Sequence, residues 1–134
     1  WADGMQSLHG IHVHGFPNCF ILSNPQSGFT ASYPHMLNEQ AKHLAYVIRK
    51  GIEAKWNALE VTPEAEQAWI DQCIAKARNV GDFFENCTPG YYNNEGKIGE
   101  RSAQDGFYGG GPVEFIKILE TWRAADALEG LERR

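Results

Sequence analysis

Histidine and cysteine are the residue types in this chain that could carry chemistry by themselves. His12 and His14 have the spacing of two metal ligands on one face of a strand. A transition-metal site needs a third and a fourth ligand, and the sequence fixes none beside this pair, so half-exposed strand histidines are the preferred interpretation. Cys87 falls in a loop where its thiol could act as a nucleophile, whereas Cys19 and Cys73 fall in apolar patterns typical of inert packing. We therefore predict no metal site.

Three glycine-containing stretches resemble the motifs of common enzyme classes, and none of them matches fully. Residues 90–97 space their glycines one residue too far apart for a phosphate-binding loop, and residues 106–111 do not match the dinucleotide fingerprint G-x-G-x-x-G. His14-Gly15 could begin an oxyanion loop of the α/β-hydrolase type, but the sequence has no G-x-S-x-G nucleophile and no histidine after His43. We therefore expect no phosphate-binding loop, no dinucleotide fingerprint and no hydrolase chemistry in this chain.

The stretch from His14 to Gln40 is where we expect a ligand to bind. Residues 19–22 are an apolar run of strand length, and a loop of proline, glycine and small polar residues follows them. Pro34 then stands where the first residue of a helix is preferred. In an open α/β sheet, ligands bind beyond the carboxyl end of a strand and against the N-terminus of the next helix. The sequence therefore predicts the edge of a cofactor site here, with Met36 beside it.

Three helices are predicted to position this edge. The first runs from Pro34 to about Gly51, the second from the N-cap Thr62 to about residues 79–81, and the third begins at Pro112. One face of the first helix is apolar at helical spacing and is expected to be buried: Leu37, Ala41, Leu44, Ala45, Ile48 and Ile52. The other two helices are expected to bury Ala65, Trp69, Cys73 and Ala77, and Phe115, Ile118 or Leu119, and Trp122. Residues 82–111 form a long aromatic and glycine-rich connection, of a kind that is more often functional than filler.

Length and composition restrict the protein class. A chain of 134 residues is one domain at most, and its net charge of −5 argues against nucleic acid as a partner. No apolar run approaches the roughly 20 residues needed to span a bilayer, so we expect no membrane association. Three widely spaced cysteines favour a reducing compartment, which we take to be the cytoplasm. The start at Trp1, followed by a loop-like ADG, predicts the C-terminal part of a longer protein.

Six motifs occur together along the chain: ADG at 2–4, LHG at 8–10, GFPNCF at 15–20, YPHMLNEQA at 33–41, TPGYYNNEG at 88–96 and GGPV at 110–113. In this combination the chain resembles the C-terminal portion of Baeyer–Villiger-type flavin monooxygenases, which depend on FAD and NADPH. The resemblance runs nearly end to end. GFPN before an apolar strand occurs widely in that family, whereas TPGYYNNEG and GGPV point to a subgroup.

The resemblance implies an α/β fold in which this chain completes a larger protein. The chain would be the C-terminal segment of an FAD-binding flavoprotein with two dinucleotide-binding domains, helix-rich with one or two short strands when taken alone. Its parts would be a strand and cofactor loop (1–33), two helices (34–80), an aromatic glycine-rich loop (81–111), and a last helix with a tail (112–134).

The resemblance also implies which residues approach the ligands. The cofactor-binding residues would be Pro25, Gln26 and Ser27 in the loop, and Met36 and Leu37 at a helix N-terminus that faces the flavin ring; Tyr91 and Tyr92 would border the substrate pocket. A helix N-terminus stabilises the negative charge that a reduced flavin carries. Gln26 and Ser27 depart from the smaller residues that are commoner in the family at these positions.

In that family one oxygen atom of O2 is inserted into a ketone, which gives an ester or a lactone. The FAD and NADPH fingerprints and the catalytic arginine of the family lie upstream of these motifs, so we expect no catalytic residue in this chain and no activity from it alone. Its expected partners are a small-molecule ketone and the upstream FAD and NADPH domains. Without them it would expose apolar surface and could self-associate. The alternative is a non-enzymatic helical interaction domain.

Overall fold

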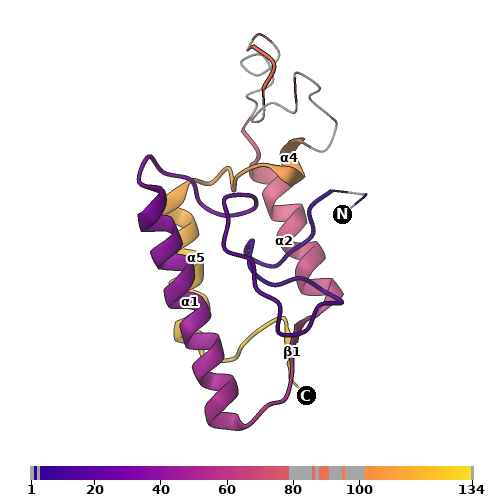
Figure 1. Cartoon of the computed structure of the whole chain (residues 1–134), viewed down its shortest axis with the longest axis vertical. Coiled ribbons are helices and arrows are strands. Elements are labelled where there is room, and N and C mark those ends of the chain that lie inside the picture. The colour runs from indigo at the N-terminus through magenta and orange to yellow at the C-terminus, as the bar shows by residue number, and fades with distance from the viewer. Residues whose placement is uncertain are drawn as a thin grey trace.

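The computed structural model describes residues 2, 4–78, 86, 88–90, 95 and 102–133 of the chain. In chain order its elements are the helix α1 (Tyr33–Ala54), the strand β1 (Leu59–Val61), the helices α2 (Pro63–Lys76), α4 (Ser102–Asp105) and α5 (Pro112–Ala125), and the strand β2 (Leu131–Arg133). The three longer helices run along the long axis of the molecule, and the N-terminal segment lies between α1 and α2 (Figure 1). No helix in the described residues is long and apolar enough to cross a membrane.

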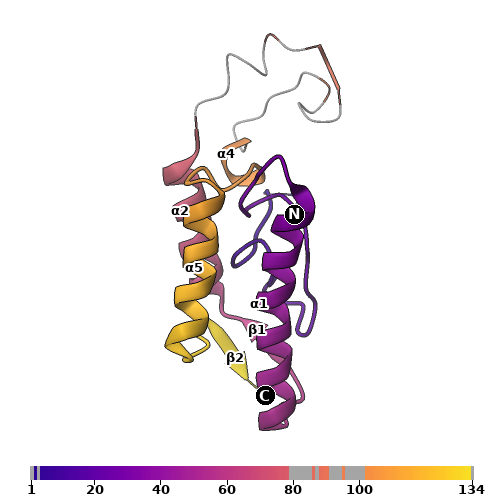
Figure 2. The same cartoon turned by 90° about the vertical axis from the view of Figure 1, so that its left-hand side faces the viewer.

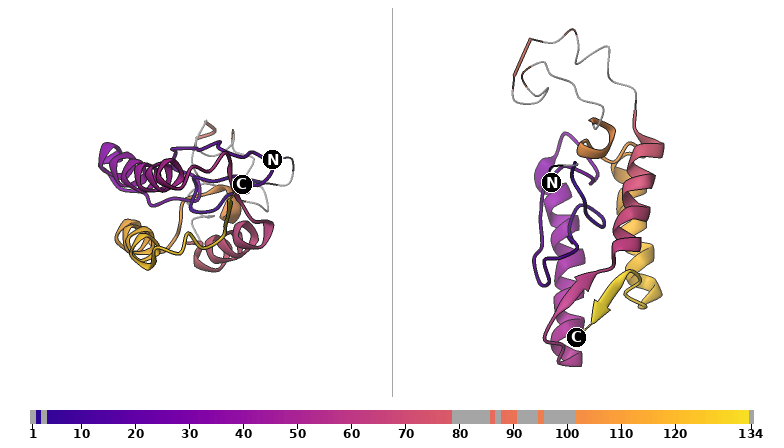
Figure 3. Two further views of the ribbon diagram at one scale, coloured as in Figure 1. Left: turned by 90° about the horizontal axis from the view of Figure 1, so that it is seen from below. Right: turned by 90° about the vertical axis from the view of Figure 1, so that its right-hand side faces the viewer.

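The core lies between α1, α2 and α5. α1 packs along α5 (Figure 2), and the view from below shows all three helices nearly end-on around the interior (Figure 3). Phe115 and Leu119 of α5 and Cys73 of α2 are each 0% exposed, and Trp69 of α2 is 2% exposed. The prediction that these four side chains are buried is confirmed.

Local sequence signals determine where the helices begin. Each of the three longer helices has a proline in its first turn, as predicted. At α2 the Thr62 hydroxyl accepts a hydrogen bond from the backbone N–H of Ala65 at 3.2 Å, which makes Thr62 an N-cap. α2 ends at Lys76, earlier than predicted, where the backbone of Gly109 approaches closely. A Cβ added to Gly109 would stand 1.8 Å from the Lys76 carbonyl oxygen, so only glycine fits there.

The strand predicted at residues 19–22 is not formed. Phe20 makes a single bridge with His12, and the backbone N–H of Ile21 donates to the Ile11 carbonyl at 2.8 Å. A strand needs a neighbour along its whole length, and within the described residues only residues 11–12 lie beside it. Leu22, expected in the interior, is 40% exposed.

The two strands that do form are short and lie elsewhere. β1 and β2 pair antiparallel, with Leu59 opposite Arg133 and Val61 opposite Leu131. Val61, Leu59 and Leu131 turn their side chains into the core. Each strand has only three residues, too few for an alternating pattern to be recognised in the sequence. The C-terminal residues, expected to be a polar tail, are therefore a structural element that closes one end of the core.

α1 turns inward a different face from the one that its periodicity predicts. The buried residues of α1 are Met36, Glu39, Gln40, His43 and Val47. Of the predicted apolar face, Leu37 and Leu44 are half-buried, Ala41 and Ala45 are exposed, and Ile48 and Ile52 are 43% and 73% exposed. The prediction that this helix face is buried is therefore wrong for the segment alone. The described residues pack against the side of α1 that carries Met36, His43 and Val47 instead.

Candidate functional site

The N-terminus of α1 is open to its surroundings. Ser32 holds the N-cap position but makes no side-chain capping hydrogen bond, and the first turn contains no acidic residue. Ser32, Tyr33, Pro34 and His35 are all exposed. The positive end of the helix dipole is therefore not neutralised by an acidic side chain of its own first turn, and it is suited to an electron-rich ligand.

The loop before α1 is held in place by the side chain of Gln26. The Ser7 hydroxyl donates to Gln26 Oε1 at 2.5 Å, and Gln26 Nε2 donates to the carbonyl oxygens of Met5 at 2.7 Å and Gln104 at 3.1 Å. Gln26 is 0% exposed and adopts a left-handed backbone with φ 56°. Its amide therefore joins the N-terminal segment, the loop and α4.

Backbone hydrogen bonds connect this loop to the segment before α5. The N–H of Gln26 donates to the Gly106 carbonyl at 2.7 Å, and the N–H of Tyr108 donates to the Ser27 carbonyl at 2.9 Å. The Ser27 hydroxyl is directed at the carbonyls of Ser23 and Asn24, at 2.7 and 2.8 Å. These bonds bring residues 26–29 beside residues 106–108.

An exposed aromatic pair results from that connection. The rings of Phe29 and Phe107 stack with centroids 4.3 Å apart and an interplanar angle of 18°. They are 48% and 40% exposed and offer an apolar surface, of which Phe29 stands four residues before Tyr33, the first residue of α1. The glycine-rich stretch that contains Phe107 stands out in the sequence, but its contact with Phe29 does not, because no local pattern reports a contact between distant loops.

The five predicted cofactor-binding residues divide into two groups. Pro25 and Leu37 are half-buried, so their side chains are partly available. Gln26 and Ser27 are 0% exposed and Met36 is 1% exposed, so the segment itself covers both the side chains and the backbones of these three residues. Tyr91 and Tyr92, predicted to border a substrate pocket, lie outside the described residues, as does Cys87.

Three histidines form a buried cluster behind the site. His9 lies between His43 and Trp69, with ring centroids 5.6 and 4.9 Å away, and His12 lies 5.9 Å from His43. Burial lowers the pKa of His9 to about 3 and that of His12 to about 4. Burial, followed by the repulsion of the other two histidines and Arg123, lowers the pKa of His43 to about 2. All three rings are therefore neutral near pH 7.

The cluster does not have the arrangement expected of a metal site. No group of three or more potential ligands gathers in the part of the chain that the structure describes. His12 and His14, predicted on one strand face, separate: His12 is 3% exposed, whereas His14 is exposed and its Nδ1 lies 2.9 Å from the Val61 carbonyl oxygen. The chain turns at His14, so the two rings do not share a face.

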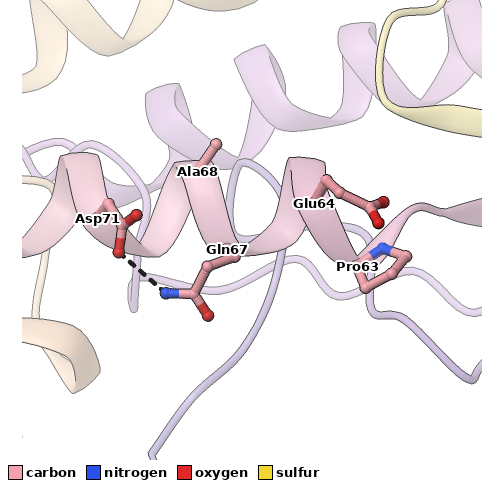
Figure 4. Close-up of a pocket in the computed structure, with 5 residues that line it drawn as sticks. All are labelled: Pro63, Glu64, Gln67, Ala68 and Asp71. Atoms are coloured by element: carbon pink, nitrogen blue, oxygen red, sulfur yellow. Dashed lines mark hydrogen bonds between the residues drawn. The ribbon is translucent and has the colours of Figure 1, made fainter.

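A surface hollow also runs along α2, away from these residues (Figure 4). It is lined by Pro63, Glu64, Gln67, Ala68 and Asp71, all from one helix. Gln67 Nε2 donates to Asp71 Oδ1 at 2.9 Å, as the dashed line in Figure 4 marks. Since no second element contributes side chains to it, we assign it no function.

Comparisons with known proteins give a consistent set of relatives. The chain is 46% identical over 134 residues to pentalenolactone D synthase of Streptomyces exfoliatus, and the matched region covers 100% of this chain and 23% of that protein. It is 37% identical over 132 residues to a Baeyer–Villiger monooxygenase of Stachybotrys chlorohalonatus, covering 98% of this chain and 21% of the other. The chain thus spans less than a quarter of the length of these relatives.

Solved structures share the fold. A polycyclic ketone monooxygenase from Thermothelomyces thermophila matches with a TM-score of 0.82 and 31% identity, over 98% of this chain and 21% of that one. A closed structure of cyclohexanone monooxygenase matches with a TM-score of 0.75 and 28% identity, over 98% of this chain and 24% of the other. No family model matches the sequence.

Proposed function

Because the chain belongs to the Baeyer–Villiger-type, FAD-binding monooxygenases as a C-terminal segment of them, we propose that it completes the flavin and ketone site of a whole enzyme of that kind. The whole enzyme would use NADPH and O2 to insert one oxygen atom into a ketone, giving an ester or a lactone. FAD, when bound, supplies the redox chemistry with O2. The segment supplies binding surfaces and no catalytic residue.

The observation that carries this proposal is the open N-terminus of α1, preceded by the loop whose Phe29 stacks on Phe107. An uncapped helix start without acidic residues fits the electron-rich edge of a flavin ring, because its backbone amides can donate to that edge. In this arrangement the half-buried Leu37 and Pro25 face the ring. The buried Gln26, Ser27 and Met36 act on the cofactor indirectly, by holding the loop and the helix start in place.

The aromatic pair would contact the substrate. Phe29 and Phe107 offer exposed apolar surface, with Phe29 in the loop that leads into α1, and such a surface suits the body of a carbocyclic ketone and excludes water from it. Structural neighbours named for polycyclic ketones and for cyclohexanone support that substrate class. Tyr91 and Tyr92 remain proposed members of the same pocket.

The experiment uses the full-length polypeptide that carries this segment. We expect purified protein to retain FAD near one per chain, and to consume NADPH and O2 with a product heavier than the ketone by one oxygen atom. Protein that folds but retains no flavin would contradict the proposal and would favour the helical interaction domain.

We also propose a cytoplasmic location, supported by the free thiols of Cys19 and Cys73.

A further inference from the structure

Tyr108 follows Phe107 directly in the chain, and its side chain is fixed at two points. Its ring is stacked on the Trp69 ring, with centroids 5.1 Å apart and an interplanar angle of 18°. Its hydroxyl donates a hydrogen bond to Glu114 Oε1 at 2.7 Å. Burial, followed by this bond to Glu114, raises the pKa of Tyr108, so the hydroxyl remains a donor near pH 7. The stack fixes the plane of the ring, and the hydrogen bond fixes its direction.

The carboxylate that receives the Tyr108 hydroxyl is itself held in place. Lys76, the last residue of α2, donates to the same Oε1 atom of Glu114, which stands in the first turn of α5. The bonds from Lys76 and Tyr108 lower the pKa of Glu114, so it stays ionised and accepts from both. The turn before α5 also closes on the Tyr108 ring, because a Cβ added to Gly110 would stand 2.5 Å from Tyr108 Cε1.

The backbone of Tyr108 connects this anchor to the exposed aromatic pair. Its N–H donates to the Ser27 carbonyl at 2.9 Å, two residues before Phe29, and Phe107 is the residue on its other side. Phe29 and Phe107 are 48% and 40% exposed, so much of each ring lacks protein neighbours that would hold it. The positions of both rings therefore depend on the backbone that Tyr108 holds.

We propose that Tyr108 is a positioning residue of the ketone site, whose hydrogen bond to Glu114 fixes the Phe29–Phe107 pair in the orientation that receives the substrate. The proposal rests on the proposed function, in which this pair contacts the ketone. Tyr108 is only 2% exposed, so it acts through Phe107 rather than by touching the ketone.

The chain contains a second arrangement of the same chemistry, which serves as a control. The Tyr46 hydroxyl donates to Asp126 Oδ1, and Lys50 Nζ donates to Asp126 Oδ2 at 2.8 Å. Asp126 is the C-cap of α5, whereas Glu114 lies in the first turn of the same helix. A separation of 12 residues, from 114 to 126, corresponds to about 18 Å along a helix, so the control lies far from the aromatic pair.

The experiment uses the full-length polypeptide with Tyr108→Phe and, separately, Tyr46→Phe. Each substitution removes one hydroxyl from a tyrosine–carboxylate–lysine group and keeps the ring. Melting temperature, FAD content, kcat and the KM for a carbocyclic ketone are measured for both. We expect similar, small decreases in melting temperature. In Tyr108→Phe the KM should rise about threefold or more with kcat and FAD content unchanged, because the lost interaction acts on binding. In Tyr46→Phe the KM should not change.

Two further variants show whether Tyr108 acts by the proposed route. Glu114→Ala removes the acceptor from an exposed position and should raise the KM as Tyr108→Phe does. In a Phe107→Ala background, Tyr108→Phe should raise the KM no further, because the ring that it positions is already absent.

Three results would overturn the inference: an unchanged KM in Tyr108→Phe or Glu114→Ala, an equal rise in Tyr46→Phe, or a full additional rise in the Phe107→Ala background. A wild-type polypeptide that folds without FAD and without turnover would refute the proposed function, and this inference with it. An active enzyme whose KM ignores Tyr108 would refute only the positioning role.

Discussion

The indole N–H of Trp69 donates to the main-chain carbonyl of Gln26 at 3.2 Å, across 43 positions of sequence. This bond joins α2 to the loop that precedes α1. Gln26 thus uses its backbone N–H, its carbonyl and both side-chain polar atoms within the protein. A residue expected at the cofactor therefore acts on the site indirectly, by fixing the loop that forms it.

Replacing Gln26 should destabilise the fold strongly. Gln26→Ala removes the acceptor of the buried Ser7 hydroxyl and the donor to the Gln104 carbonyl. It also removes one of the two donors to the Met5 carbonyl, which keeps Gln104 Nε2. We expect a loss of about 2–4 kcal/mol in the free energy of unfolding, measured by urea denaturation. Gln67→Ala is the matched control, since Gln67 is exposed and its side chain bonds Asp71 on the surface of the same helix, and it should change stability by less than about 0.5 kcal/mol. Similar losses for the two variants would contradict the role of Gln26.

Two glycine-to-alanine substitutions should have opposite effects. Gly109→Ala places a Cβ 1.8 Å from the Lys76 carbonyl oxygen, which the backbone can accommodate only by moving α2 away from residues 107–109. We expect a loss of about 3 kcal/mol or more. Gly51→Ala lies inside α1 with its nearest outside neighbour, Trp56, at 3.7 Å, and should raise stability by about 0.5–1 kcal/mol. Thermal denaturation of both variants tests the pair. A neutral Gly109→Ala would show that the contact with Lys76 is not tight.

The parts of the fold that the sequence predicts are those with local causes. Pro63 with its N-cap Thr62, and Pro112 after Gly111, specify helix starts within a few residues, and both are where expected. The strand at residues 19–22 fails because a strand depends on a neighbour that no local signal names. The face of α1 that contains Ile48 and Ile52 is apolar, as the periodicity indicates, but it is not the face that the described residues bury. Periodicity shows that a face is apolar and does not show what covers it.

The candidate site is predicted only in part for a related reason. The helix start at Tyr33 follows from Pro34, whereas the internal role of Gln26 depends on Ser7, Met5 and Gln104, which are distant in sequence. A buried glutamine in a polar loop leaves no pattern in the sequence.

The buried histidines predict a loss of stability in mild acid. The pKa values of His9, His12 and His43 are lowered in the folded protein, so the unfolded chain binds more protons once the pH falls below about 6.5. Their contribution to stability is complete above pH 6.5 and is lost as the pH falls toward the lowered values. At pH 5.5 the loss is on the order of 1 kcal/mol per histidine.

Urea denaturation at pH 7.5 and pH 5.5 measures this loss. His43→Leu should reduce the difference between the two pH values, whereas Gln40→Leu, on the same buried face, should leave it unchanged because glutamine does not titrate. The lowered pKa values of Glu114 and Asp126 place their own contributions at lower pH, outside this window. An unchanged difference in His43→Leu would show that His43 is not the titrating group.

The aromatic pair should affect ketone binding more than flavin binding. In the full-length polypeptide, Phe29→Ala or Phe107→Ala removes one ring of an exposed stack, so the fold should survive. We expect the KM for a carbocyclic ketone to rise about tenfold, equivalent to about 1.4 kcal/mol, with FAD content unchanged. In the double variant the loss of binding free energy for the ketone should be smaller than the sum of the losses in the two single variants, because the two rings contact each other. Phe16→Ala is the control, since Phe16 is 63% exposed but belongs to a different loop. An equal effect of Phe16→Ala would remove the pair from the site.

The open start of α1 predicts a conflict between helix stability and cofactor binding. Ser32→Asp supplies the missing N-cap acceptor and a negative charge at the positive end of the dipole, so α1 should gain about 0.5–1 kcal/mol. The same carboxylate would repel an electron-rich flavin, and most strongly its reduced, more negative form. In the full-length polypeptide we therefore expect a higher melting temperature of the flavin-free protein, together with weaker FAD retention and a lower flavin reduction potential.

A matched substitution separates these effects. Thr62→Asp adds the same charge at the N-cap of α2, where the Thr62 hydroxyl already accepts from Ala65 and no ligand is proposed. It should leave the reduction potential unchanged. Ser32→Asp could also stabilise α1 without lowering the reduction potential or weakening FAD retention. That result would show that the flavin does not lie at this helix end, because a charge at the start of α1 would act on a flavin bound there as well as on the helix.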